Sequence, residues 1–242
     1  MKRFFDKNEL AFSLIWIGAY VVLLSLADHV SATIGTEKLI TAPLCVVMTA
    51  VLLLFVKRSG LTAYCGLTKG SLRARDYLYF LPLVVLASTN FWGGAALNMS
   101  VLETALYILS MICVGILEEV IFRGLLFNAL KKDNVVRAVI ISSLTFGIGH
   151  IVNLLNGADV FATLLQIVYA TAAGFLFTVI FLCSGSLVPC IVTHCAINSF
   201  SAVAGESSAL LDMITAAVLT VVATVYALWI LKKQKKVSEE SK

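Results

Sequence analysis

Eight apolar runs, separated by short polar segments, are the feature that most constrains the fold of this chain. A membrane-spanning helix needs about 20 predominantly apolar residues. Of the 242 residues, 60% are hydrophobic and 13% are charged, whereas soluble domains have about 45–50% apolar and about 25% charged residues. The sequence therefore predicts an all-α fold, a polytopic transmembrane helical bundle of about eight spans that forms a single membrane domain over residues 1–242. The runs are 10–27, 39–56, 77–92, 104–130, 136–155, 160–183, 186–203 and 208–231.

Lysines and arginines are distributed unevenly between the two ends of these runs. Cytoplasmic loops of membrane proteins carry an excess of both residues. If the N-terminus is cytoplasmic, 16 of the 18 basic residues fall in cytoplasmic segments, while Lys38 lies outside and Arg123 lies within a run. This distribution favours an even number of spans with both termini in the cytoplasm. The basic segment 57–76 is expected on the membrane surface, and nothing in the charge pattern indicates a nucleic-acid partner.

Five ionisable residues lie deep within the runs, namely Glu118, Glu119, Arg123, His150 and His194. A charged side chain at the centre of a bilayer costs about 2.5–3.5 kcal/mol on insertion scales. Residues of this kind usually face the interior of the bundle, pair with one another and mark a functional site. We therefore expect these residues to form the functional site of the protein.

Helical periodicity sorts the charges of the run 104–130. Glu119 and Arg123 are separated by four residues and can pair on one face. Glu118 points about 100° away from Glu119, so it needs a partner from another helix. The pair has two interpretations, a purely structural ion pair or a support for a functional carboxylate at Glu118.

The histidines lie on other runs, and each has a second motif residue one turn away. Phe146 precedes His150 by four residues, and Asn198 follows His194 by four. Measured from the cytoplasmic ends of their helices, Glu118, His150 and His194 lie about 18, 20 and 12 Å deep. A lone histidine is more often a hydrogen-bonded core residue, but the similar depths predict one polar site open to water. Gly147 and Gly149 should let a neighbouring helix approach closely.

Three short motifs carry a family resemblance. The stretch "EEVIFR" (Glu118, Glu119, Arg123) resembles the EExxxR motif of the CAAX-protease and bacteriocin-processing (CPBP, or ABI) family of intramembrane proteases. "FGIGH" is similar to its FxxxH motif, and "HCAIN" to its HxxxN motif. The resemblance implies a catalytic core at 104–203, an eight-helix membrane fold, and hydrolysis of peptide bonds in a cavity open to the cytoplasm.

The preferred mechanism is general-base hydrolysis. Glu118 would activate a water molecule that His150 also holds, and His194 and Asn198 would donate hydrogen bonds to the oxyanion. Supporting roles fall to Glu119, Arg123 and Phe146. No cofactor is favoured; the alternative is a zinc ion held by Glu118, His150 and His194.

The predicted function is an intramembrane endopeptidase that cleaves a membrane-associated peptide or protein precursor. Expected partners are that substrate and the lipid bilayer, with another membrane protein as a further candidate, and the expected location is the plasma membrane, as a multi-pass protein of bacterial type. One alternative is a non-catalytic membrane scaffold or bacteriocin self-immunity protein. Another is a proton-coupled transporter, although the sequence has no duplicated half.

Overall fold

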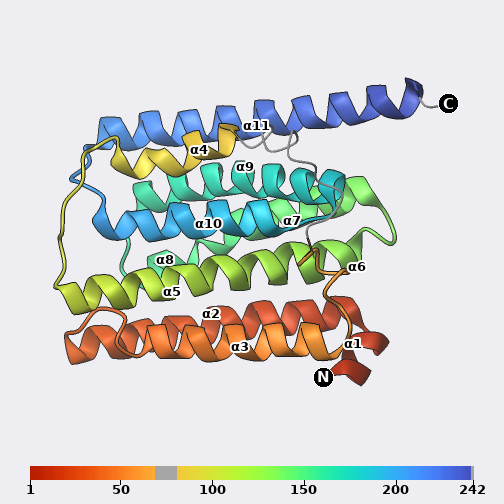
Figure 1. Cartoon of the computed structure of the whole chain (residues 1–242). Coiled ribbons are helices and arrows are strands. Elements are labelled where there is room, and N and C mark those ends of the chain that lie inside the picture. Colours follow the sequence, from red (N-terminus) through yellow and green to blue (C-terminus); the bar gives the residue numbers. More distant parts are fainter. Residues whose placement is uncertain (69–80, 241–242) are drawn as a thin grey trace.

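A computed structural model of the chain describes residues 1–68 and 81–240, which fold as a bundle of long helices (Figure 1). The predicted all-α, polytopic fold is confirmed. Its elements are α1 (Lys2–Lys7), α2 (Glu9–Ile34), α3 (Thr41–Arg58), α4 (Leu81–Ser88), η2 (Thr89–Phe91), α5 (Val101–Glu119), η3 (Val120–Phe127), α6 (Asn128–Leu130), α7 (Val135–Gly149), α8 (Val152–Leu155), α9 (Val160–Ser184), α10 (Val188–Phe200), η4 (Ser201–Val203) and α11 (Ala209–Glu240).

Within the described residues, six continuous helical segments are long and apolar enough to cross a membrane. They are Glu9–Ile34, Thr41–Arg58, Val101–Leu130, Val135–Leu155, Val160–Ser184 and Ala209–Gln234. The other two predicted runs correspond to shorter apolar helices, Pro82–Phe91 and Val188–Val203. Part of the run 77–92 lies outside the described residues, so the count of eight stays a prediction.

Polar residues and glycines define the ends of the long helices. Ser100 and Glu103 form a capping box at the start of α5, which satisfies two backbone N–H groups that have no partner within the helix. The carboxylate of Asp159 caps α9 in a similar way. Gly35 and Gly185 end α2 and α9 in the left-handed conformation, which glycine adopts without steric cost. These local signals fix where the chain can reverse direction.

The long helices α2 and α7 run one way along the bundle, and α3, α5, α9 and α11 run the other way (Figure 1). The shorter helices α4 and α10 return the chain between α3 and α5 and between α9 and α11. The N-terminus, the end of α3, the α6–α7 connection and the C-terminal end of α11 lie at one end of the bundle. The α2–α3 and α8–α9 connections lie at the other. This agrees with the alternation from which the basic residues were assigned to one side. Which end faces the cytoplasm stays a prediction.

The chain after α3 returns to the body of the protein. Ser186 Oγ donates a hydrogen bond to the carbonyl of Thr68 (2.7 Å), and Leu187 N donates to the carbonyl of Gly66 (2.8 Å). Thus the described part of the segment 57–76 packs against the α9–α10 turn. Residues 69–76 lie outside the described residues, and their placement on the membrane surface stays a prediction.

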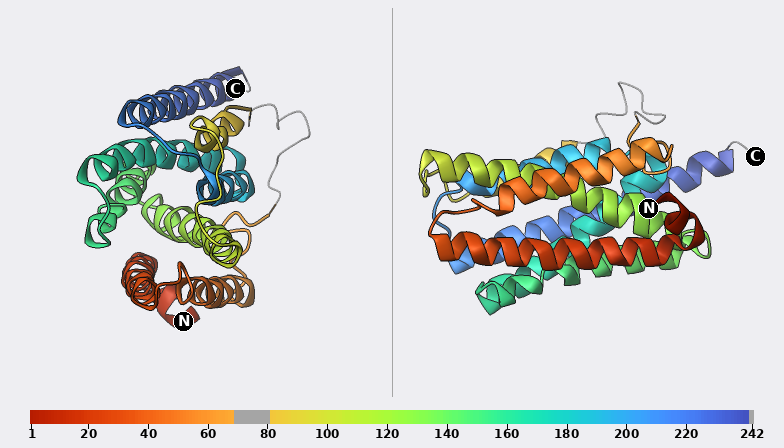
Figure 2. Two further views of the ribbon diagram at one scale, coloured as in Figure 1. Left: turned by 90° about the vertical axis from the view of Figure 1, so that its left-hand side faces the viewer. Right: turned by 90° about the horizontal axis from the view of Figure 1, so that it is seen from below.

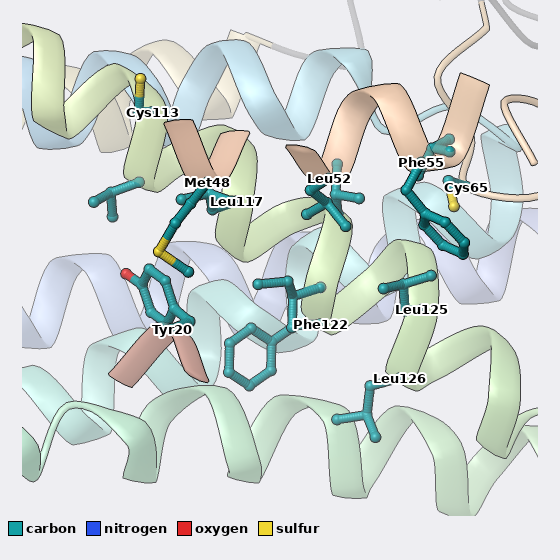
Figure 3. Close-up of a cluster of buried hydrophobic side chains, with 14 of the residues drawn as sticks. Tyr20, Met48, Leu52, Phe55, Cys65, Cys113, Leu117, Phe122, Leu125 and Leu126 are labelled. Carbon is teal, nitrogen blue, oxygen red and sulfur yellow. The ribbon is translucent and has the colours of Figure 1, made fainter. Parts of the chain in front are cut away.

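The continuous helix from α5 through η3 lies in the middle of the bundle. Viewed end-on, the α2–α3 hairpin covers one side of it, and α9, α10 and α11 lie on the other (Figure 2). One apolar cluster joins this central helix to α2 and α3 (Figure 3), and a second joins α9, α10 and α11. Every residue from Glu119 to Asn128 is consequently buried. The charged motif residues therefore occupy the most enclosed part of the fold.

Candidate active site

The central helix changes its hydrogen-bonding pattern at the charged motif. It is α-helical up to Glu119 and π-helical from Val120 to Phe127. π-helical segments are rare and occur frequently at functional sites. A π-helix has a wider turn than an α-helix. A rotation of 100° per residue applies only to a regular α-helix, so it does not predict the wider turn. Even so, Arg123 in η3 remains within reach of Glu119.

Glu119 and Arg123 form the predicted ion pair. Arg123 Nη1 lies 3.1 Å from Glu119 Oε1, and both side chains are completely buried. The Arg123 guanidinium also stacks over the Phe146 ring, 4.1 Å from its centroid, a favourable cation–π arrangement. Gly174 on α9 makes room for this stack, because a Cβ there would lie 3.0 Å from Arg123 Nη2 and 3.1 Å from Phe146 Cδ1.

His194 of α10 lies between the two adjacent glutamates. Its Nδ1 atom is 2.9 Å from Glu119 Oε1, and its Nε2 atom is 3.3 Å from Glu118 Oε2. The expectation that Glu118 takes a partner from another helix is therefore confirmed. That His194 contacts both carboxylates was not predicted, since sequence spacing cannot say which way a ring from another helix points.

Tyr20 of α2 supplies a second partner for Glu118. Its hydroxyl donates to Glu118 Oε1 at 2.6 Å. Sequence reasoning missed this residue. The available signal was weak: a buried tyrosine hydroxyl usually finds a hydrogen-bond partner, but nothing in the sequence identifies Glu118 as that partner.

Phe146 joins the second histidine to this group. Its ring lies edge-on to the rings of both His150 (5.4 Å between centroids) and His194 (5.7 Å). His150 directly follows α7, and its Nδ1 atom is 3.2 Å from the carbonyl oxygen of Phe146. Asn198 lies one turn after His194 on α10, half-buried, and its side-chain amide has no hydrogen-bond partner among the described residues. The three motifs thus meet around Phe146.

Two glycines set the helix spacing around the site. A Cβ on Gly115 would lie 2.9 Å from the backbone nitrogen of Cys195, so α5 and α10 are in backbone contact. A Cβ on Gly147 would lie 2.8 Å from the carbonyl oxygen of Ile167, which confirms the predicted close approach of α9 to α7 there. The same prediction for Gly149 is wrong: a Cβ there would have nothing within 4 Å, because Gly149 points away from the neighbouring helices.

The side-chain geometry also bears on the alternative zinc site. Among the described residues, no group of three or more His, Cys, Asp or Glu side chains is arranged to hold a metal ion. Both ring nitrogens of His194 face carboxylate oxygens. A zinc ion held by Glu118, His150 and His194 stays an alternative prediction.

Comparison with known proteins agrees with the motifs. Residues 100–200 match the family model described as "Rce1-like: Type II CAAX prenyl endopeptidase Rce1-like". The matched region contains the three motifs in full, which confirms the resemblance to the CPBP family. No curated protein and no solved structure gives a significant match.

Proposed function

We propose that this multi-pass membrane protein, whose core is that of a CAAX-type intramembrane protease, hydrolyses a peptide bond by activating water with Glu118. The observation that carries the proposal is the environment of the Glu118 carboxylate. One oxygen accepts a hydrogen bond from Tyr20, the other contacts His194, and the side chain is 12% exposed. An oriented carboxylate with some access to water is what a general base requires.

Glu119 is the weaker candidate for the base. Its side chain is 0% exposed, and its Oε1 atom already contacts both Arg123 and His194. A water molecule that attacks a substrate must reach the base, so Glu118, whose side chain is partly accessible, suits the role better. Glu119, paired with Arg123, instead orients the ring of His194, and His194 in turn orients the Glu118 carboxylate.

Charge balance supports this division of roles. Two ionised carboxylates and one guanidinium would leave the buried group of Glu118, Glu119 and Arg123 with a negative charge. An imidazolium at His194 would neutralise the group and donate to both carboxylates at once. Glu118 would then remain ionised and able to accept a proton. This role differs from the oxyanion donor expected for His194, because both of its ring nitrogens face carboxylates.

In the proposed reaction, Glu118 takes a proton from water and later returns it to the leaving group. Glu118 removes a proton from water as the water oxygen attacks the scissile carbonyl carbon, and His150 helps to hold that water. The side-chain amide of Asn198 donates a hydrogen bond to the oxyanion that forms. The carbon–nitrogen bond then breaks, and Glu118 delivers its proton to the leaving amine.

The proposed substrate is a membrane-associated peptide or protein precursor, and the proposed location is a bacterial plasma membrane. The CAAX-protease-like core and the apolar helices both support a substrate that reaches the site from the bilayer.

New protein termini in membranes test the function before any substrate has been identified. Membranes of cells that produce the wild-type protein are compared by terminus-selective mass spectrometry with membranes that contain Glu118→Gln. Glu37→Gln is the matched control, because it makes the same chemical change at a partly exposed position outside the helices. All three proteins are first adjusted to equal abundance.

We expect wild type and Glu37→Gln to generate the same new termini, and Glu118→Gln to generate none of them. Termini that persist in Glu118→Gln would overturn the glutamate mechanism. If no terminus depends on the wild-type protein, the protease function is wrong and the scaffold or immunity interpretation takes its place.

A further inference from the structure

We propose that Tyr20 is a positioning residue for Glu118, so that the α2–α3 hairpin is part of the catalytic unit. The inference rests on the proposed function. It extends the site beyond the region 100–200 that matches the family model, since Tyr20 lies in the first long helix, far from the three motifs in sequence.

The bond between Tyr20 and Glu118 is short and is made to the group proposed to be the base. The donor–acceptor distance is 2.6 Å, within the range of about 2.5–2.7 Å that is typical of a hydroxyl donating to an ionised oxygen. Hydrogen bonds of this type are roughly twice as strong as neutral ones. The contact is therefore expected to stabilise the ionised form of Glu118 and fix its orientation.

Packing holds the hydroxyl of Tyr20 in place. The side chain is 9% exposed and belongs to the apolar cluster between α2, α3 and α5. Figure 3 shows its ring beside Met48 of α3, close to Leu117 of the central helix. The ring is enclosed by apolar side chains, and its single polar atom donates to Glu118. A phenylalanine would retain this packing and remove only the donor.

The two partners hold the carboxylate from opposite sides. Tyr20 of α2 occupies one oxygen and His194 of α10 contacts the other. An ionised carboxylate has about four lone-pair positions, so two remain to receive a proton from water. Losing either partner would let the carboxylate rotate away from the position that suits proton transfer.

Other titratable groups also surround Glu118 and contribute to its pH response. His194 faces it from α10, and Cys45 on α3 lies within electrostatic range. On its own helix Glu119 is adjacent, and Arg123 neutralises Glu119. Tyr20→Phe leaves all of these groups unchanged, so any change in the pH dependence reports the lost hydroxyl.

The experiment uses the full-length protein in liposomes and a fluorescence-quenched synthetic peptide that carries a cleavage site identified by the terminus comparison. kcat, KM and the pH profile of kcat/KM are measured for wild type, Tyr20→Phe and Tyr64→Phe. Tyr64→Phe is the matched control, because the Tyr64 hydroxyl makes a similar bond to Glu9 (2.8 Å) away from the site. Glu118→Gln is included as the inactive reference.

We expect Tyr20→Phe to lower kcat by about 10- to 100-fold, the size of effect expected for a hydrogen bond to a charged group, with KM close to wild type. The pH profile of kcat/KM should also differ from that of wild type, because the proposed base loses a hydrogen-bond donor. Tyr64→Phe should behave as wild type.

The failures of the two proposals are distinguishable. If Tyr20→Phe retains wild-type kcat and pH profile while Glu118→Gln is inactive, the role of Tyr20 is wrong and the proposed function survives. A lower kcat with an unchanged pH profile would also contradict the proposal, because it would show a structural effect alone. If Glu118→Gln cleaves the peptide, the proposed function itself fails.

Discussion

His194 of α10 contacts Glu118 of α5 directly, with 3.3 Å between Nε2 and Oε2. The contact requires the backbones of the two helices to lie close together at Gly115. The position of the proposed base therefore depends on helix spacing as much as on the charged residues.

Adding a methyl group at Gly115 should separate the two residues. The new Cβ would lie 2.8 Å from Cys195 Sγ and 2.9 Å from Cys195 N, and a helix backbone cannot rotate away as a side chain can. We expect Gly115→Ala to lose about 1–3 kcal/mol of stability, as overpacked sites do, and to lose most of the cleavage. Thermal unfolding and peptide cleavage measure both effects. Gly18→Ala, where a Cβ meets nothing within 4 Å, should match wild type; equal behaviour of the two variants would contradict the spacing argument.

Removing one member of the buried ion pair should destabilise the protein. Glu119→Gln or Arg123→Ala leaves the other charge without its partner in a fully buried position, at a cost of about 3–5 kcal/mol. Both variants should accumulate less in membranes and unfold at lower temperature. Lys2→Ala is the control, because it breaks an ion pair of the same i,i+4 spacing on the surface, where such pairs contribute little. Normal thermal stability of both pair variants would show that the pair is dispensable for folding.

The sequence predicted the features that repeat along one helix. Glu119 and Arg123 pair because residues four apart share a face of a helix. The apolar runs were predicted to be helices because of their length. Contacts between different helices were harder to predict from the sequence. No local sequence pattern predicts that Tyr20 contacts Glu118 or that His194 lies between the two glutamates. Both contacts depend on how α2 and α10 pack around the central helix.

The environment of each glycine and the type of helix were also only partly predictable from the sequence. Gly147 and Gly149 are two residues apart in one motif, and only Gly147 meets another helix, because their side-chain directions differ. The π-helical segment from Val120 to Phe127 was also not predicted, since an apolar helical sequence carries no clear signal for the wider turn.

Asn198 should affect turnover without affecting folding. Its side-chain amide has no partner among the described residues, so Asn198→Ala leaves no buried group unsatisfied. We expect turnover to fall by about 10²–10³-fold, as for other oxyanion donors, with KM and thermal stability near wild type. His194→Ala should lose both cleavage and stability, because two carboxylates lose a partner. If Asn198→Ala cleaves the peptide at the wild-type rate, Asn198 is not the oxyanion donor.

The orientation of the bundle predicts which positions face the cytoplasm. Tags at Lys2, Lys132 and Lys235 should report the cytoplasm, and a tag at Gly157 should report the exterior. The N-terminus, the α6–α7 connection and the C-terminal end of α11 lie at one end of the bundle, and the α8–α9 connection lies at the other. A tag at Gly70 is also predicted to be cytoplasmic from the basic residues around it, although this position lies outside the described residues. Compartment-specific labelling checks each position. A cytoplasmic signal at Gly157 would contradict the predicted topology.

The most direct test of water activation by Glu118 is the peptide-cleavage rate of the purified protein after complete removal of metal. Bound metal is measured in the same sample, and Glu118→Gln sets the background rate. We predict that the chelated wild-type protein retains its cleavage rate and contains far less than one metal ion per chain. Activity that is lost on chelation and restored by one equivalent of zinc would contradict the account, and would make Glu118, His150 and His194 ligands instead of base and supporting residues.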